Sequence, residues 1–167
     1  MTKLLHKEKH DWKGVMHELE LYESNNLENI SPVKQVQAVV FVDDNNVVLY
    51  KHIDGYYGLP GGTVEIGEKF EDALRREILE ESSSEVLDFG LIGYVKDTPL
   101  ENPDKTVYQL RYWVNAKLLD IPINDPDGKA IEREIVELKD VVEKINWGER
   151  WEILLNLAVS KRKNKEE

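Results

Sequence analysis

The sequence predicts an α/β (α+β) fold in which helices pack on a sheet. Apolar runs of strand length come first, an amphipathic helix follows, further strands come next, and a second amphipathic helix comes last. This order is typical of α+β and α/β/α layering. The chain has 167 residues, of which 41% are hydrophobic and 33% charged, an ordinary globular balance. A domain of this length buries a sufficient core without disulfides or structural metal.

The expected strands follow from short apolar runs. Residues 36–42 and 47–51 flank the turn-forming sequence Asp-Asp-Asn-Asn, which predicts a β-hairpin. Residues 85–96 and 106–119 are expected strands separated by a proline-containing loop. Residues 131–138 are expected to form a shorter strand. These strands would make up the sheet.

The clearest helix is expected at residues 68–81, directly after a glycine-rich loop at residues 55–67. A helical turn at residues 139–144 and an amphipathic helix at residues 147–163 would follow the last strand. The basic residues near the end of the last helix suit the negative end of a helix dipole.

The chain divides into three unequal parts. Residues 1–34 are expected to be an N-terminal extension of strand and loop, in which residues 15–22 alternate weakly between apolar and polar. Residues 35–163 would form the main domain, and residues 164–167 a tail. The extension could pack on the domain, form a dimer contact or frame a substrate pocket, and the sequence does not choose among these.

Charge and cysteine content exclude several classes of function. The chain holds 22 Lys and Arg against 33 Asp and Glu, a net charge of −11, which disfavours binding to duplex nucleic acid. The absence of cysteine excludes disulfides, cysteine-based zinc sites and a thiol nucleophile. No apolar run is long enough for a transmembrane helix, and the charged N-terminus is unlike a signal peptide. We therefore expect a cytoplasmic protein without membrane contact, and leave a homodimer open.

The expected helix at residues 68–81 has acidic residues on the face that is apolar in its first half. On a helical wheel, the apolar residues of its first half and the acidic residues of its second half share one arc. The apolar members are Phe70, Ala73, Leu74 and Ile78, and the acidic members are Glu77, Glu80 and Glu81. Carboxylates three and four residues apart repel one another, and burying them unpaired is costly. A divalent cation such as Mg²⁺ or Mn²⁺ would remove this conflict, whereas the alternative is a solvated acidic helix end.

The glycine loop is the second signal. Gly61 and Gly62 allow the backbone to approach a ligand or metal closely. Arg76 lies four residues before Glu80, within reach along a helix, and could orient a carboxylate or form an ordinary surface ion pair. The loop and the helix together indicate one wall of a site that binds phosphate and metal.

These residues resemble the Nudix box. Gly62 is followed after five residues by Glu68, and after seven more by Arg76 and Glu77. Ile78, Leu79, Glu80 and Glu81 complete the core of the motif. Two positions depart from the family pattern, which has glycine where Ser83 stands and an apolar residue where Ser84 stands. The missing glycine puts the end of the helix in doubt, because a serine kept in a left-handed C-cap costs roughly 1–2 kcal/mol.

The resemblance implies a mixed-sheet α/β/α sandwich and a Mg²⁺- or Mn²⁺-dependent hydrolase. Its substrate would be a nucleoside diphosphate linked to a group X, of the nucleotide-sugar, ADP-ribose or (d)NTP type. By position, Glu77, Glu80, Glu81 and the Gly62 carbonyl would bind metal, and Glu77, Glu80 and Arg76 would be catalytic. Glu68 and Gly61 would support the site. Which glutamate serves as the base stays open.

The sequence evidence for residues that contact the substrate is weaker than that for the metal ligands. Tyr57 precedes the glycine loop and could stack on a base. Some family members use a further acid from a later loop, for which Glu132 and Glu134 are candidates beside the alternative of a merely charged loop. A rival function is a Nudix-fold module that binds a nucleotide without cleaving it. An isoprenoid diphosphate isomerase on the same fold is disfavoured, because it would need a catalytic cysteine and this chain has none.

Overall fold

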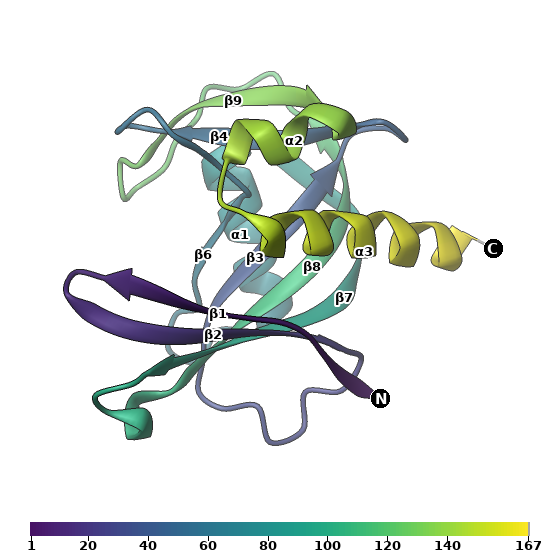
Figure 1. Cartoon of the computed structure of the whole chain (residues 1–167). Helices are drawn as coiled ribbons and strands as arrows, with labels where there is room; N and C mark the ends of the chain where they lie inside the picture. Colours follow the sequence, from purple (N-terminus) through teal and green to yellow (C-terminus); the bar gives the residue numbers. More distant parts are fainter. Residues whose placement is uncertain (167) are drawn as a thin grey trace.

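The computed structural model describes residues 1–166, and within them nine strands form one mixed sheet (Figure 1). The order along the sheet is β1-β2-β7-β8-β3-β4-β5, with β6 paired to β3 and β9 paired to β4. β3 and β8 are parallel, and the other pairs are antiparallel. The strands are β1 (Thr2–Trp12), β2 (Val15–Ser24), β3 (Val33–Phe41), β4 (Asn46–His52), β5 (Tyr57–Gly58), β6 (Gly61–Thr63), β7 (Ser84–Pro99), β8 (Val107–Leu118) and β9 (Ala130–Glu137).

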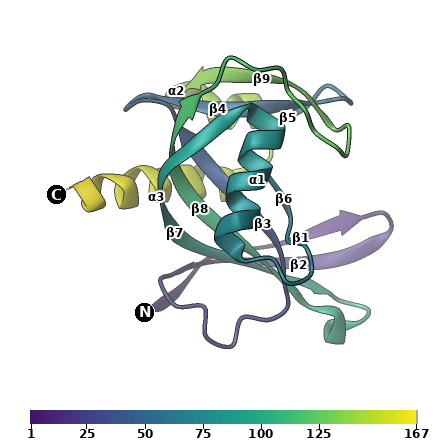
Figure 2. The ribbon, with the colours of Figure 1, turned by 180° about the vertical axis from the view of Figure 1, so that it is seen from behind.

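Helices cover both faces of this sheet. α1 (Phe70–Ser82) packs on one face, as the view from behind shows (Figure 2). α2 (Leu138–Ile145) and α3 (Glu149–Glu166) pack on the other face (Figure 1). A short 3-10 helix, η1 (Pro103–Lys105), lies in the turn between β7 and β8. The expected mixed-sheet α/β/α sandwich is therefore confirmed.

The N-terminal residues extend the same sheet. β1 and β2 form a hairpin, and β2 pairs with β7 from His17 opposite Pro99 to Glu23 opposite Gly93. The sequence indicated only a weak strand at residues 15–22. β1 was missed because every one of its residues is exposed or half-buried, so the strand lacks a buried apolar face. The hairpin projects beyond the helical layer (Figure 1).

At the other end, the last helix runs further than expected. α3 continues to Glu166, so residues 164–166 of the expected tail are helical, and Glu167 lies outside the described residues. Lys165 ties this end to the sheet, because its Nζ donates to Asp88 Oδ1 at 2.7 Å. None of the described helices is long and apolar enough to cross a membrane.

α1 ends at Ser82 in a left-handed cap. Ser83 has φ 47° and ψ 48°, and its N–H donates to the Leu79 carbonyl at 3.0 Å. The serine thus takes the conformation that glycine would have adopted more easily. Arg133 of β9 supplies the positive charge that the last turn lacks, by donating to the carbonyls of Ser82 (3.0 Å) and Ser83 (2.6 Å).

Candidate active site

At Gly61 and Gly62, the glycine loop has no room for a side chain. In β6, Gly62 pairs with Val36 of β3. A Cβ on Gly61 would lie 2.2 Å from the Val36 carbonyl oxygen. A Cβ on Gly62 would lie 2.5 Å from Cδ of the Glu77 carboxylate. Both glycines are therefore required by close approach: Gly61 to the sheet and Gly62 to the acid of the helix.

The acidic stripe of α1 faces inward, as the helical wheel predicts. Glu77 and Glu81 are only 5% and 9% exposed, close to the values of the apolar residues beside them. Glu80 is half-buried at the edge of the same face. The Gly61 N–H donates to Glu81 Oε2 at 3.4 Å, which joins loop and helix. The alternative of a solvated acidic helix end does not describe Glu77 or Glu81.

Arg76 ties the acidic groups together. Its guanidinium forms a bidentate pair with Glu68, with N–O distances of 2.8 and 3.0 Å. Its Nη1 also donates to Glu77 Oε1 at 2.8 Å and to Glu80 Oε2 at 3.4 Å. Its Nη2 reaches the Thr63 carbonyl at 2.9 Å. Glu68 in turn accepts the Glu65 N–H at 2.9 Å, so the pair also fixes the turn that enters α1. This arrangement explains why the helix begins at Phe70 rather than Glu68.

Burial and mutual repulsion disfavour ionisation of the stripe. Burial, followed by the charge of Glu77, raises the pKa of Glu81 to about 9. Burial also raises the pKa of Glu77 and of Glu80, although Arg76 partly opposes both shifts. Glu68 is the exception, because its hydrogen bonds from Arg76 lower its pKa. The site therefore holds more carboxylate than its own cations neutralise.

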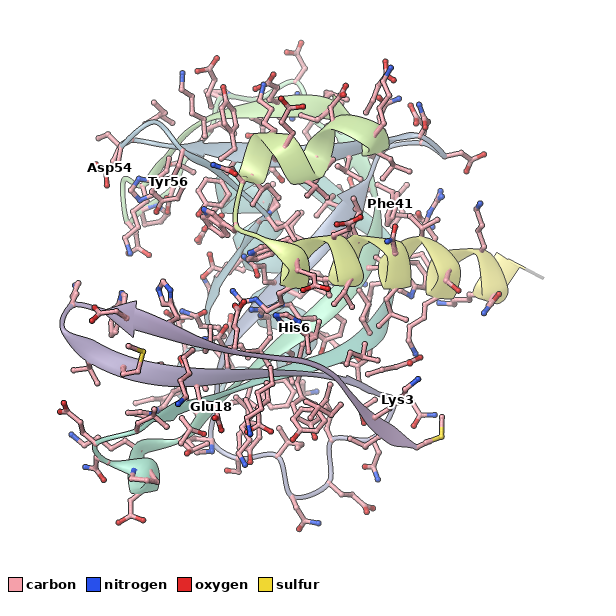
Figure 3. The ribbon with its side chains drawn as sticks, viewed as in Figure 1. Lys3, His6, Glu18, Phe41, Asp54 and Tyr56 are labelled. Atoms are coloured by element: carbon pink, nitrogen blue, oxygen red, sulfur yellow. The ribbon has the colours of Figure 1, made fainter. Side chains whose placement is uncertain are left out.

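Glu77 and Glu81 line a cavity of about 240 Å³, whereas Glu68, Arg76 and Glu80 are not among its lining residues. One part of its wall is Gly61, Gly62, Glu77 and Glu81, and another is formed by Tyr50, His52 and Tyr56. The rest of the lining is Gln35, Val36, Gln37, Leu59, Thr63, Asp125, Asp127 and Lys129. Tyr56 and Asp54 lie on the loop that follows β4 (Figure 3). A larger hollow of about 450 Å³ between α3 and β7 has no carboxylate in its lining and is not a candidate site.

Three of the sequence candidates lie away from this cavity. Glu132 and Glu134 are on β9, where they pair with Lys51 and Lys144 respectively. Arg133, between them, is the residue that reaches the end of α1, and alternation along a strand turns its two neighbours to the opposite face. Tyr57 packs on the α3 side of the sheet with Lys144 Nζ 4.5 Å from its ring centre. The structure does not bring these three residues to the carboxylates.

The acidic residues that reach the cavity from later in the chain are Asp125 and Asp127, and Lys129 of the same loop also lines it. The charge of Asp125 helps to raise the pKa of Glu80 and of Glu81, and the charge of Asp127 helps to raise the pKa of Glu77 and of Glu80. Asp125 also shapes the loop, since its carboxylate accepts the N–H groups of Asp127, Lys129 and Ala130. The sequence signal was the turn-forming run Asp-Pro-Asp-Gly at residues 125–128, which places acids in a loop rather than in a strand.

The donor chemistry fits a hard divalent cation. Among residues 1–166, no three His, Asp or Glu side chains converge closely enough to form a complete metal site by themselves. Mg²⁺ bound with a phosphate substrate needs only one or two carboxylates, the remaining ligands being phosphate oxygens and water. Glu77 and Glu81 supply buried oxygen donors of this kind beside the Gly61–Gly62 backbone. The residues present therefore fit a metal held jointly with substrate.

Comparison with known proteins agrees with this fold. The Nitrosomonas europaea NUDIX hydrolase aligns with 20% identity and a TM-score of 0.63, over 78% of this chain and 90% of that one. A mutant of the Bacillus subtilis pyrophosphohydrolase BsRppH aligns with 22% identity and a TM-score of 0.61, over 79% and 77%. An ADP compounds hydrolase aligns with 15% identity and a TM-score of 0.59, over 98% and 95%, so the likeness includes the N-terminal hairpin. The family model of the NUDIX domain matches residues 33–157, most of the chain, and the protein therefore belongs to the Nudix family of hydrolases.

Proposed function

We propose that this protein is a divalent-metal-dependent pyrophosphohydrolase whose substrate is a nucleoside diphosphate linked to a group X. The observation that carries the proposal is the pair Glu77 and Glu81, two buried carboxylates that line one cavity with the Gly61–Gly62 backbone. Buried acids with raised pKa values in a cavity are candidates for catalytic groups. Nucleotide sugars, ADP-ribose and (d)NTPs all contain the required anhydride.

Glu77, Glu80, Glu81 and the Gly62 carbonyl are the groups that would hold Mg²⁺ or Mn²⁺. The cation, when bound, would neutralise phosphate charge and lower the pKa of the attacking water. Arg76 keeps Glu77 and Glu80 in place through its two hydrogen bonds, and Glu68 holds Arg76 in turn. Gly61 supports Glu81 through its N–H.

The chemical step needs a carboxylate that acts as the base. The water oxygen bonds to one phosphorus, the P–O bond of the anhydride breaks, and a carboxylate accepts the proton of the water. Glu77 and Glu80 both contact Arg76 and are both suited to this role. We do not assign the base to one of them, because the geometry of the substrate decides which lies closer to the water.

A substrate panel tests the proposal. It contains ADP-ribose, nucleotide sugars, dinucleoside polyphosphates, and normal and oxidised (d)NTPs, each with Mg²⁺ and with Mn²⁺. The Glu80→Gln variant serves as the blank, and Glu71→Gln, an exposed acid in the first turn of the same helix, is the matched control. We expect metal-dependent cleavage of one class by wild type and Glu71→Gln but not by Glu80→Gln.

The rival is a module that binds a nucleotide without cleaving it. Ser83 and Ser84 were its only support in the sequence, and the left-handed cap at Ser83 leaves the acidic face intact. Nucleotide-induced thermal stabilisation without product across the whole panel would favour this reading over ours.

A further inference from the structure

His52 ends β4 and brings an imidazole to the wall of the cavity that holds Glu77 and Glu81. The residue is buried, with 9% of its surface exposed. Each of its two ring nitrogens can donate or accept a hydrogen bond. The proposed chemistry uses the acids of α1 and the Gly61–Gly62 backbone, so it leaves the imidazole without a role.

The turn after β4 fixes this imidazole in position. The His52 N–H donates to the Tyr56 carbonyl at 2.8 Å, and the Gly55 N–H donates to the His52 carbonyl at 2.8 Å. Gly55 has φ 95°, a left-handed value that favours glycine. The Tyr56 ring stacks on the imidazole with ring centres 4.2 Å apart and an angle of 12° between the planes. Figure 3 shows Tyr56 beside Asp54 at the outer end of this turn.

The same turn determines which ring nitrogen carries the proton. The Asp54 N–H donates to His52 Nδ1 at 3.0 Å, so Nδ1 is an acceptor. The Asp54 carboxylate is largely solvated, and its Oδ2 lies further from Nδ1, at 3.4 Å. We therefore assign the ring proton to Nε2, which becomes a donor.

This Nε2–H has no partner in the protein. Within residues 1–166, no group accepts a hydrogen bond from it. Because Nδ1 faces the turn, Nε2 lies across the ring from the turn and faces the cavity that His52 lines. Polar groups of buried side chains nearly always have a hydrogen-bond partner, so the position calls for an acceptor from outside the chain.

We propose that His52 binds the diphosphate of the substrate by donating its Nε2–H to a phosphate oxygen. This inference rests on the proposed function and adds to its site a residue that lies outside the acidic helix. A hydrogen bond to a charged oxygen is stronger than one to a neutral oxygen, so a phosphate is the acceptor that gains most from a fixed donor.

Lys129 supports the choice of a phosphate. It is the one Lys or Arg among the lining residues, all of which are described. Its carbonyl accepts the Ile53 N–H at 2.8 Å, so the loop of Lys129 is joined to the chain directly after His52. A diphosphate in the cavity would meet an imidazole N–H and an ammonium group, in addition to metal held by the carboxylates of α1.

Binding of a diphosphate that cannot be hydrolysed tests the inference. The probe is methylenediphosphonate, titrated in the presence of Mg²⁺, and Mg²⁺ alone is titrated in parallel. His52→Phe keeps an aromatic ring on Tyr56 but removes both nitrogens, whereas His52→Gln keeps a side-chain N–H in place of Nε2–H. His10→Phe, at an exposed histidine of β1 outside the cavity, is the matched control. Circular dichroism verifies folding, and His52→Leu replaces His52→Phe should the larger ring not be accommodated.

We expect His52→Phe to weaken methylenediphosphonate binding by roughly 10- to 150-fold, the range for losing a hydrogen bond to a charged group. His52→Gln should recover most of the lost affinity, and His10→Phe should bind the probe as wild type does. The affinity for Mg²⁺ alone should be the same in all of these proteins.

Unchanged methylenediphosphonate affinity in His52→Phe, or no binding of this probe by wild type, would overturn the inference. An equal loss in His52→Gln would overturn it too, because the ring and not the N–H would then be responsible. A parallel loss of Mg²⁺ affinity would show that His52 acts through the carboxylates instead of on the phosphate. These measurements need no turnover, so failure of the hydrolysis panel would leave them standing and the two proposals fail separately.

Discussion

The carboxylate of Glu77 occupies the space where a side chain at Gly62 would begin. A Cβ on Gly62 would lie 2.5 Å from Glu77 Oε2 and 2.6 Å from Oε1. Arg76 holds the same carboxylate from the other direction through a 2.8 Å hydrogen bond to Oε1. Glycine is therefore needed at position 62, because the Glu77 carboxylate fills the space that a Cβ would take.

Gly62→Ala should displace the Glu77 carboxylate and lower kcat by roughly 100-fold, the cost of misplacing a catalytic group by about 1 Å. Its melting temperature should also decrease, because the buried acid has no other space. Adding Glu77→Asp, which withdraws the carboxylate by one methylene, should recover the lost melting temperature. Thermal unfolding and steady-state kinetics on both variants check this, and a Gly62→Ala protein as active as wild type would contradict the steric account.

The sequence predicted the parts of the fold that have a strong local pattern. The acidic stripe of α1 was visible because Glu77 and Glu81 continue the arc of Ala73 and Leu74. β1 was not predicted, because its side chains are mostly solvated on both faces. Its charged residues therefore do not alternate with apolar ones in the way that marks a half-buried strand. The acids that reach the cavity from the later loop, Asp125 and Asp127, depend on how a turn folds back over the sheet, which no periodicity encodes.

Ser83 provides a measure of strain at the end of α1. Its left-handed conformation is costly for any residue with a Cβ, while its Oγ donates to the Pro122 carbonyl at 3.0 Å. Ser83→Ala and Ser83→Gly both lose this hydrogen bond, but only glycine escapes the strain. We expect Ser83→Gly to have a free energy of unfolding about 1–2 kcal/mol greater than that of Ser83→Ala. Urea denaturation measures the difference, and equal stability of the two variants would show that the cap is unstrained.

The metal-free protein should lose stability as the pH rises. Folding raises the pKa of Glu81 from 4.5 to about 9, chiefly through burial. Between these values the folded protein binds a proton that the unfolded chain has released, so stability decreases by up to about 1.4 kcal/mol per pH unit. Melting temperatures in EDTA at several pH values between 5 and 9 should decrease for wild type and much less for Glu81→Gln. An equal decrease in both proteins would assign the effect to other groups.

Arg111 is a second buried charge, remote from any carboxylate partner. It is 5% exposed on β8, and among the described residues its guanidinium donates only to the Leu110 carbonyl and to Gln109 Oε1. Burial, followed by the charge of Arg150, lowers its pKa to about 9. Arg111→Met should therefore raise the free energy of unfolding at pH 7 by about 1–4 kcal/mol.

Arg133→Met is the contrasting variant, because it removes the hydrogen bonds to the Ser82 and Ser83 carbonyls and should destabilise the protein. Urea denaturation at pH 7 checks both variants, and a destabilised Arg111→Met would show that the two hydrogen bonds of Arg111 outweigh the cost of its burial.

The most direct test of the account is the rate of anhydride hydrolysis as a function of Mg²⁺ concentration, with the substrate that the panel identifies. Wild type and Glu71→Gln should show the same saturating dependence on Mg²⁺. Glu80→Gln and Glu81→Gln should lose turnover by orders of magnitude while keeping the wild-type circular dichroism spectrum. Near wild-type rates in both of these variants, or hydrolysis that is unchanged in EDTA, would contradict the claim that the acidic face of α1 carries the reaction.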